Sequence, residues 1–256
     1  MVVDLDRFDV FEKGRYVHLP PDEFVYGLRR DFLLVRKNRY RVSVLPGQEK
    51  LSNQGIGWLT EDNTPESYDQ LWGDEAALAQ FLSEADNARV RLTEEIVDHI
   101  VSLVAEDARV VDIGCGAGDL LLAVRRKCPT VSVAGLDFSP KAIERARTNL
   151  PDGDFVLDRI SKLPYEDERF DVVLCTDTLE HLERPVSLIE DLVRICRPGG
   201  SVVIVVPDGD VDDFLGHVWF WNEASLTALL SPWSATVQRL PDTREFLAVI
   251  TRHNRS

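Results

Sequence analysis

Between residues 109 and 206, short runs of apolar, mostly β-branched residues alternate with segments whose apolar positions have helical spacing. Such runs predict strands at 109–113, 131–136, 154–157, 170–175 and 201–206. Strands that alternate with amphipathic helices in this way form a parallel sheet with helices on both faces.

Two further runs, 234–240 and 246–251, are separated by only the five residues 241–245. So short a link permits an antiparallel hairpin but no parallel crossover. The predicted fold is therefore α/β, a doubly wound, mostly parallel seven-stranded sheet of Rossmann-like type with a reversed strand near one edge. A helix is expected before the sheet, from about Asn87, because apolar residues from Val90 to Val104 recur at helical spacing.

Charge divides the chain into two parts. Residues 1–60 carry 10 Lys/Arg and 8 Asp/Glu, a net charge of +2, whereas residues 61–256 carry −17 of a total of −15. We expect an N-terminal β-rich extension over 1–60 and a main domain over 61–256. Within the extension, 32–35 and 40–44 predict a hairpin. Its basic residues between Arg29 and Arg41 either prevent a solvent-exposed edge strand from pairing with another chain or recruit an anionic molecule.

Composition excludes several classes of protein. Hydrophobic residues make up 44% of the chain, enough for a sizeable core, yet no apolar run approaches the roughly 18 residues of a membrane span. The N-terminus lacks the basic-then-apolar pattern of a signal peptide. The 4 cysteines form no CxxC pair, which argues against a zinc site or a disulfide framework and favours a reduced, cytoplasmic location. The acidic total disfavours nucleic acid and other long polyanions.

Glycines alternate directly after the first sheet strand, in the stretch Asp112-Ile113-Gly114-Cys115-Gly116-Ala117-Gly118. Glycines at such a strand-to-helix turn permit a tight bend and the close approach of a ligand to the backbone. The turn lies at the carboxyl edge of the sheet, where ligands bind in this class of fold. Glycines chosen for steric reasons alone are the competing interpretation.

The ligand is unlike a dinucleotide. The dinucleotide fingerprint G-x-G-x-x-G/A requires a small residue where this chain has Asp119. A carboxylate there repels the pyrophosphate that a helix N-terminus otherwise attracts. A ligand with a cationic or neutral centre fits better, and a nicotinamide oxidoreductase is disfavoured.

This loop resembles the cofactor loop of class I S-adenosylmethionine-dependent methyltransferases, in the subgroup with small or varied acceptors (methyltransferase type 11-like). The resemblance covers about residues 85–256 and continues in order through Gly135-Leu136-Asp137-Phe138-Ser139, Ile160-Ser161-Lys162-Leu163-Pro164-Tyr165, Phe170-Asp171-Val172-Val173-Leu174, Leu179-Glu180-His181-Leu182 and Arg197-Pro198-Gly199-Gly200. It implies S-adenosyl-L-methionine as cofactor, bound by Asp112, Gly114, Cys115, Gly116, Gly118, Asp137, Phe138, Asp158, Arg159, Ile160 and Cys175.

Three of these positions also have independent interpretations. Asp137 ends the second strand, where a carboxylate can accept hydrogen bonds from two ribose hydroxyls; a helix cap is the alternative, although Ser139 before Pro140 is better placed for that. Phe138 lies beside the adenine or packs in the core. The family has an Asp directly before Ile160, whereas this chain has Arg159 there, with Asp158 one place earlier.

The acceptor side is expected after the fourth strand. His181 is the candidate general base, because its ordinary pKa lies near neutrality, or it only shapes the cofactor pocket. Asp177 and Glu180 are candidates to orient the acceptor, or they cap the helix that follows. Trp219 and Trp221 form an apolar lid over the acceptor or belong to the core. Tyr68 and Trp72 resemble the family's N-terminal cap.

The predicted function is methyl transfer to the oxygen or nitrogen of a small-molecule acceptor, and the alternative is a catalytically silent protein of this fold that binds a partner. The loop after the fourth strand lacks the Asn/Asp-Pro-Pro-aromatic motif of many base-modifying methyltransferases, so nucleic acid is not expected as a substrate. No membrane is expected as a partner, and a homodimer is left open. No metal site is predicted: an EF-hand needs a Glu where Trp219 stands, so the cluster Asp208, Asp210, Asp212 and Asp213 is interpreted as a solvated loop.

Overall fold

The computed structural model describes residues 65–73, 88–160, 162–182, 185–212, 217, 219–241 and 243–253, together with five short strands near the N-terminus. These strands are β1 (Val10–Glu12), β2 (Arg15–Val17), β3 (Gly27–Leu28), β4 (Leu33–Leu34) and β5 (Arg41–Val42). Within these residues, no helix has the length and apolar character needed to span a membrane.

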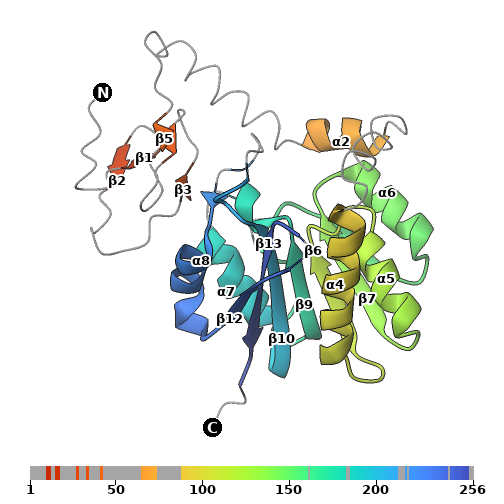
Figure 1. Cartoon of the computed structure of the whole chain (residues 1–256). Coiled ribbons are helices and arrows are strands. Elements are labelled where there is room, and N and C mark those ends of the chain that lie inside the picture. The colour runs from red at the N-terminus through yellow and green to blue at the C-terminus, as the bar shows by residue number, and fades with distance from the viewer. Residues whose placement is uncertain are drawn as a thin grey trace.

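The main sheet has seven strands in the order β12-β13-β10-β9-β6-β7-β8 (Figure 1). Five neighbouring strands are parallel, and β13 is antiparallel to both β10 and β12. The expected mostly parallel sheet with a reversed strand beside its edge is therefore confirmed. The strands are β6 (Arg109–Ile113), β7 (Ser132–Asp137), β8 (Asp154–Leu157), β9 (Phe170–Thr176), β10 (Cys196–Pro207), β12 (Thr236–Arg239) and β13 (Glu245–Thr251).

Helices cover both faces of this sheet. Side chains of α4, α5 and α6 share one apolar cluster with Val110, whereas side chains of α7 and α8 share the other with Val111. Successive strand residues point to opposite faces, so the central strands of the sheet contribute side chains to both clusters. The helices are α4 (Ala88–Leu103), α5 (Asp119–Lys127), α6 (Pro140–Asn149), α7 (Pro185–Ile195) and α8 (Glu223–Leu230).

The N-terminal strands form small antiparallel ladders. β1 pairs with β2, and β4 pairs with β5 in the register Leu33↔Val42, which confirms the expected hairpin. The basic side chains between Arg29 and Arg41 lie outside the described residues. β3 pairs with β11 (Trp219–Phe220), so a strand from the first sixty residues joins the part of the chain that follows β10. The boundary at residue 60 stays a prediction.

Helix α2 (Pro65–Gly73) lies against α6 at one end of the sheet (Figure 1). Asp69 Oδ1 accepts hydrogen bonds from Ser139 Oγ at 2.5 Å and from the backbone N–H of Lys141 at 3.1 Å. Arg145 Nε donates to the carbonyl oxygen of Trp72 at 2.6 Å. These contacts place α2 next to the glycine turn, where the N-terminal cap was expected.

Candidate active site

The glycine turn between β6 and α5 has a backbone that other residues rarely adopt. Gly114, Gly116 and Gly118 have φ angles of 83°, 52° and 77°, in the left-handed region that favours glycine. A Cβ on Gly114 would lie 2.1 Å from Thr178 Oγ1, and one on Gly116 would lie 2.9 Å from the Trp72 ring. The first two glycines are therefore required by close neighbours as well as by backbone conformation.

Asp137 holds this turn against the end of β7. Its Oδ2 accepts a hydrogen bond from the Gly116 N–H and its Oδ1 accepts one from the Ser139 N–H, each at 2.9 Å. Ser139 is the N-cap of α6, since its Oγ accepts from the Ala142 N–H at 3.1 Å. The capping role predicted for Ser139 is thus confirmed, and Asp137 is left facing the turn.

Asp112 is a buried carboxyl group at the end of β6. It is 2% exposed, and its Oδ1 accepts no hydrogen bond from the residues that the structure describes. Burial, followed by the carboxylates of Asp137 and Asp177, raises the pKa of Asp112 to about 7. Three carboxyl groups gathered beside the glycine turn favour a cationic ligand and oppose a phosphate.

The ring of Phe138, which follows β7, contacts the ring of Tyr68 on α2. Their ring centroids are 5.1 Å apart at an interplanar angle of 69°, an edge-to-face contact. Tyr68 also contacts the His181 ring edge-on, with centroids 6.3 Å apart. The α2 cap therefore connects the second strand of the expected cofactor site to the expected acceptor side.

The remaining predicted cofactor residues are placed differently. The thiols of Cys115 and Cys175 are buried among apolar side chains, and burial raises the pKa of each above its ordinary value. Asp158 and Arg159 are exposed after β8, and Asp158 is tied to the site by its N–H, which donates to the Asp137 carbonyl at 3.1 Å. Ile160 packs against the core. These five positions therefore offer backbone groups and packing rather than a converging set of side chains.

The acceptor side begins where β9 ends. Asp177 has a left-handed φ of 48°, and its N–H donates to the Val205 carbonyl at 3.1 Å. The short helix η1 (Leu179–His181) follows and places the Glu180 side chain inside the protein, with 1% of it exposed. Burial, followed by the nearby Asp177 carboxylate, raises the pKa of Glu180 well above its ordinary value.

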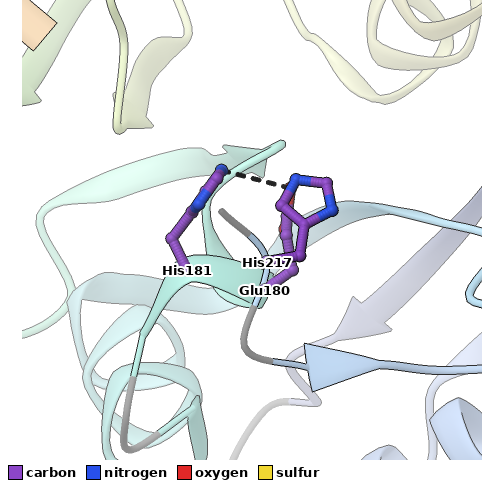
Figure 2. Close-up of side chains that lie close together, drawn as sticks. All are labelled: Glu180, His181 and His217. Atoms are coloured by element: carbon purple, nitrogen blue, oxygen red, sulfur yellow. Dashed lines mark ion pairs between the residues drawn. The ribbon is translucent and has the colours of Figure 1, made fainter. Parts of the chain in front are cut away.

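Two histidines meet above Glu180 (Figure 2). Glu180 Oε1 lies 3.8 Å from His181 Nε2 and 3.7 Å from His217 Nε2. The two imidazole rings are in edge-to-face contact, with centroids 4.7 Å apart. His217 Nδ1 is in turn hydrogen-bonded to Asp212 Oδ2 at 2.7 Å. The structure thus groups Glu180 and His181 with two residues to which the sequence assigned no role.

The interpretation of the acidic stretch after β10 as a solvated loop is wrong for two of its members. Asp208 is 3% exposed and pairs with Arg239 at 2.8 Å. The Asp212 side chain is 9% exposed and bonds to His217. Both are buried because a cationic or hydrogen-bonding partner compensates the loss of water. Asp210 is exposed, and Asp213 lies outside the described residues.

Comparison with known proteins agrees with this geometry. Residues 111–204 match the family described as "Methyltransferase domain". The chain is 33% identical over 146 residues to 27-O-demethylrifamycin SV methyltransferase of Amycolatopsis mediterranei, covering 53% of this chain and 52% of that protein. It is 30% identical over 160 residues to ubiquinone biosynthesis O-methyltransferase of Nitrosomonas europaea, covering 59% and 64%. The chain therefore spans about half to two thirds of the length of these relatives.

A solved structure shares the fold. The S-adenosylmethionine-dependent methyltransferase of Aquifex aeolicus superposes with a TM-score of 0.53 at 19% identity, covering 68% of this chain and 98% of that one. Residues 111–204 are thus similar in sequence to methyltransferase domains, and the fold is that of S-adenosylmethionine-dependent methyltransferases of class I.

The residues around the glycine turn suit S-adenosylmethionine as cofactor. The three left-handed glycines open the backbone beside β6, and Asp137 lies one strand away, where the ribose is expected. The Oδ1 of Asp112 is buried and unpartnered among the described residues, which fits a predicted contact with an ammonium group. A nucleoside that carries a sulfonium and an ammonium group matches the negative charge gathered here.

The two tryptophans for which a lid or a core position was predicted are stacked on each other. Trp219 and Trp221 have ring centroids 5.8 Å apart and nearly parallel planes, at 2°. Trp219 Nε1 donates to the Leu182 carbonyl at 2.7 Å, which ties the lid to the end of η1. Trp221 is 1% exposed and belongs to the apolar core, whereas Trp219 is half-buried and packs against it. Of the two predicted lid residues, Trp219 is therefore the one that lies beside the acceptor side.

Proposed function

We propose that this protein transfers a methyl group from S-adenosylmethionine to an oxygen or nitrogen atom of a small-molecule acceptor. The observation that carries the proposal is the buried carboxyl group of Asp112, with an unpartnered oxygen, next to three left-handed glycines and the carboxylate of Asp137. This arrangement supports a cationic nucleoside and disfavours nicotinamide dinucleotides, whose pyrophosphate the carboxylates repel.

S-adenosylmethionine supplies an electrophilic methyl group and a neutral thioether as leaving group. The transfer is an in-line displacement: the acceptor atom forms its bond to the methyl carbon as the carbon–sulfur bond breaks, and the acceptor's proton leaves. Because the thioether needs no proton, alignment of the two reactants supplies much of the acceleration. In this chain, the glycine turn and Asp137 hold the nucleoside while η1 positions groups for the acceptor.

His181 on η1 is the predicted general base for an acceptor that must lose a proton. His181 lies between Tyr68, which belongs to the cap, and His217, which belongs to the lid segment. A hydroxyl acceptor must lose its proton, whereas a neutral amine can react first and lose it later. Asp177 and Glu180 remain candidates to orient the acceptor, together with Trp219. The names of the two relatives refer to methylation at oxygen, which supports a hydroxyl acceptor here.

Calorimetry with S-adenosylhomocysteine tests the first half of this proposal, and NADH serves as the control ligand. We expect binding of the nucleoside and none of NADH. A protein that binds neither would overturn the proposed function. Incubation with methyl-labelled cofactor and a metabolite pool tests the second half, because the labelled product reports turnover. Binding without any labelled product would favour a silent, partner-binding protein instead.

A further inference from the structure

Three side chains with metal-binding atoms converge on the acceptor side of the sheet edge. Glu180 offers a carboxylate oxygen, and His181 and His217 each offer a ring nitrogen, all within 4.8 Å of one another. Figure 2 shows Glu180 and His181 coming from the same turn, while His217 comes from the segment after β10. Two imidazoles and one carboxylate are a ligand set typical of zinc and of other divalent transition metals.

The state of Glu180 calls for a cation. Only 1% of its side chain is exposed, and neither carboxylate oxygen accepts a hydrogen bond within the described part of the chain. A buried carboxylate is costly unless it is paired or coordinates a metal. The two histidines approach Oε1 at 3.7 and 3.8 Å, distances longer than a hydrogen bond. The oxygen therefore lies within ion-pair distance of both rings and accepts a hydrogen bond from neither.

Asp212 orients His217 as a ligand. The Asp212 carboxylate is hydrogen-bonded to Nδ1 of His217 at 2.7 Å. A proton on Nδ1 leaves a lone pair on Nε2, which is the atom that faces Glu180. Histidines that bind metals almost always donate their other ring N–H to a carboxylate, a carbonyl or a water molecule. The pairing with Asp212 is thus a second feature of a metal site, on a residue outside the three ligands.

We propose that Glu180, His181 and His217 bind a divalent transition-metal ion, with Asp212 as the positioning residue for His217. Zinc bonds to nitrogen and oxygen are about 2.0–2.2 Å long, so ligand atoms of a tetrahedral site lie about 3.3–3.5 Å apart. The observed separations of 3.7 and 3.8 Å need to shorten by only a few tenths of an ångström. Three protein ligands leave a coordination position open, as in catalytic rather than structural sites.

The open coordination position on the ion determines which class of acceptor can bind. This consequence rests on the proposed function. A hydroxyl oxygen of the acceptor coordinates the ion, which lowers the pKa of that hydroxyl. Its proton leaves to water before the new carbon–oxygen bond forms, so no side chain needs to hold it. The acceptor is therefore a small molecule with a metal-binding hydroxyl group. His181 then acts on the acceptor through the ion instead of as a general base.

Cobalt(II) is the probe, because its visible absorption reports ligand number and does not depend on catalysis. The metal-stripped protein is titrated with Co²⁺, and we expect a stoichiometric visible spectrum that EDTA abolishes. His217→Ala and Glu180→Gln lower Co²⁺ affinity at least 100-fold. Asp212→Asn lowers it by about 10- to 100-fold, the range typical of groups that orient a ligand. His253→Ala removes an exposed histidine near the C-terminus and leaves the affinity unchanged.

Thermal unfolding and calorimetry with S-adenosylhomocysteine accompany each titration. A wild-type protein that binds the nucleoside but gives no cobalt spectrum overturns the metal site and leaves the proposed function standing. A cobalt spectrum without nucleoside binding overturns the proposed function and leaves the metal site standing. If Asp212→Asn unfolds at the wild-type temperature and binds Co²⁺ as wild type does, its positioning role is wrong. A cobalt affinity that is equal in wild type and in folded His217→Ala overturns the site as a whole.

Discussion

The two halves of the sheet's carboxyl edge are built by different means. On the β6–β7 side, the expected cofactor region is shaped mainly by the backbone: by three glycines with left-handed φ angles and by two backbone N–H groups that donate to Asp137. On the β9–β10 side, side chains from η1 and from the segment around residue 217 create the features. In the proposed function, the first half holds the nucleoside by its shape and charge, and the second half holds the groups that meet the acceptor.

This contrast predicts a separation of effects. Substitutions on the β6–β7 side change nucleoside affinity before any acceptor is present. Substitutions of Glu180, His181 or His217 on the β9–β10 side change turnover and leave nucleoside affinity nearly intact, since these side chains face one another. Thr178 is the exception on this side, because it lies against Gly114 of the glycine turn. A substitution that moves both quantities equally would show that the two halves act as one unit.

The largest effect is expected for Gly114→Ala. The new Cβ meets Thr178 Oγ1 at 2.1 Å, and an alanine at a φ of 83° costs a further ~1–2 kcal/mol. We expect loss of detectable S-adenosylhomocysteine binding by calorimetry. Gly199→Ala is the matched control, because Gly199 also has a left-handed φ, of 76°, but lies in β10 away from the turn. If both variants bind the nucleoside equally, the turn does not form the cofactor site.

The pH dependence of stability gives the next largest effect, through Asp112. Its folded pKa, raised by burial to about 7, lies above the ordinary value of 3.8. The folded state then binds a proton that the unfolded state has released, so the free energy of unfolding falls as pH rises through this interval. The shift corresponds to about 4 kcal/mol, lost between roughly pH 4 and pH 7.

Urea unfolding of Asp112→Asn and wild type at several pH values measures this term. We expect the variant to gain stability relative to wild type as pH rises from 5 to 8, by several kcal/mol. Asp119→Asn, at an exposed carboxylate in the first turn of α5, is the control and should show no such gain. A constant difference between Asp112→Asn and wild type across this range would contradict the raised pKa.

A smaller loss is expected for Asp137→Ala. The substitution removes the acceptor for two backbone N–H groups and for the expected ribose hydroxyls. Hydrogen bonds to a charged group contribute about 1.5–3 kcal/mol, so nucleoside affinity should fall by about 10- to 100-fold. Asp154→Ala removes an exposed carboxylate at the start of β8, at the opposite end of that strand, and should alter affinity by less than threefold. An equal loss in both variants would argue for general electrostatics over a specific contact.

The fold and the β6–β7 half could be predicted from sequence for the same reason. Strand and helix periodicity is a local property of the sequence. The expected cofactor loop is one continuous stretch, and its glycines indicate a backbone conformation that other residues rarely adopt. Ser139 directly before Pro140 likewise predicts that Ser139 caps the N-terminus of the helix that follows. In these regions the backbone geometry requires particular residue types at particular positions, so the sequence pattern is consistent with few other structures.

The β9–β10 half could be predicted only in part. His181 and Glu180 follow a recognisable strand, but His217 is 36 positions away and no local pattern links it to them. Asp208 looks like a solvated acidic residue because its partner Arg239 is brought near only by the fold. Asp212 bonds to His217 only five positions further along, a contact that the loop conformation creates and no sequence pattern predicts. Burial of a charge depends on such tertiary partners, which spacing along the chain does not encode. Cys115 and Cys175 illustrate the converse, since adjacency to a motif does not fix where a side chain points.

The smallest effect is expected for Trp219→Phe, on the acceptor side. Phenylalanine keeps an aromatic ring next to Trp221 but removes the N–H that donates to the Leu182 carbonyl. One neutral hydrogen bond contributes about 0.5–1.5 kcal/mol, so the melting temperature should drop by a few degrees. Because Leu182 follows directly after His181, the loosened end of η1 should lower kcat/KM by roughly the same free energy, about 3- to 10-fold.

Nucleoside affinity decides whether this last effect separates the two halves. Calorimetry on Trp219→Phe should give an S-adenosylhomocysteine affinity within twofold of wild type, because Trp219 touches η1 and the core rather than the glycine turn. Trp233→Phe, in the short helix after α8, is the control for a general loss of an indole and should leave kcat/KM unchanged. If Trp219→Phe weakens nucleoside binding as much as it lowers kcat/KM, the lid communicates with the cofactor region. The cap residue Tyr68, which contacts both Phe138 and His181, is then the route by which it does so.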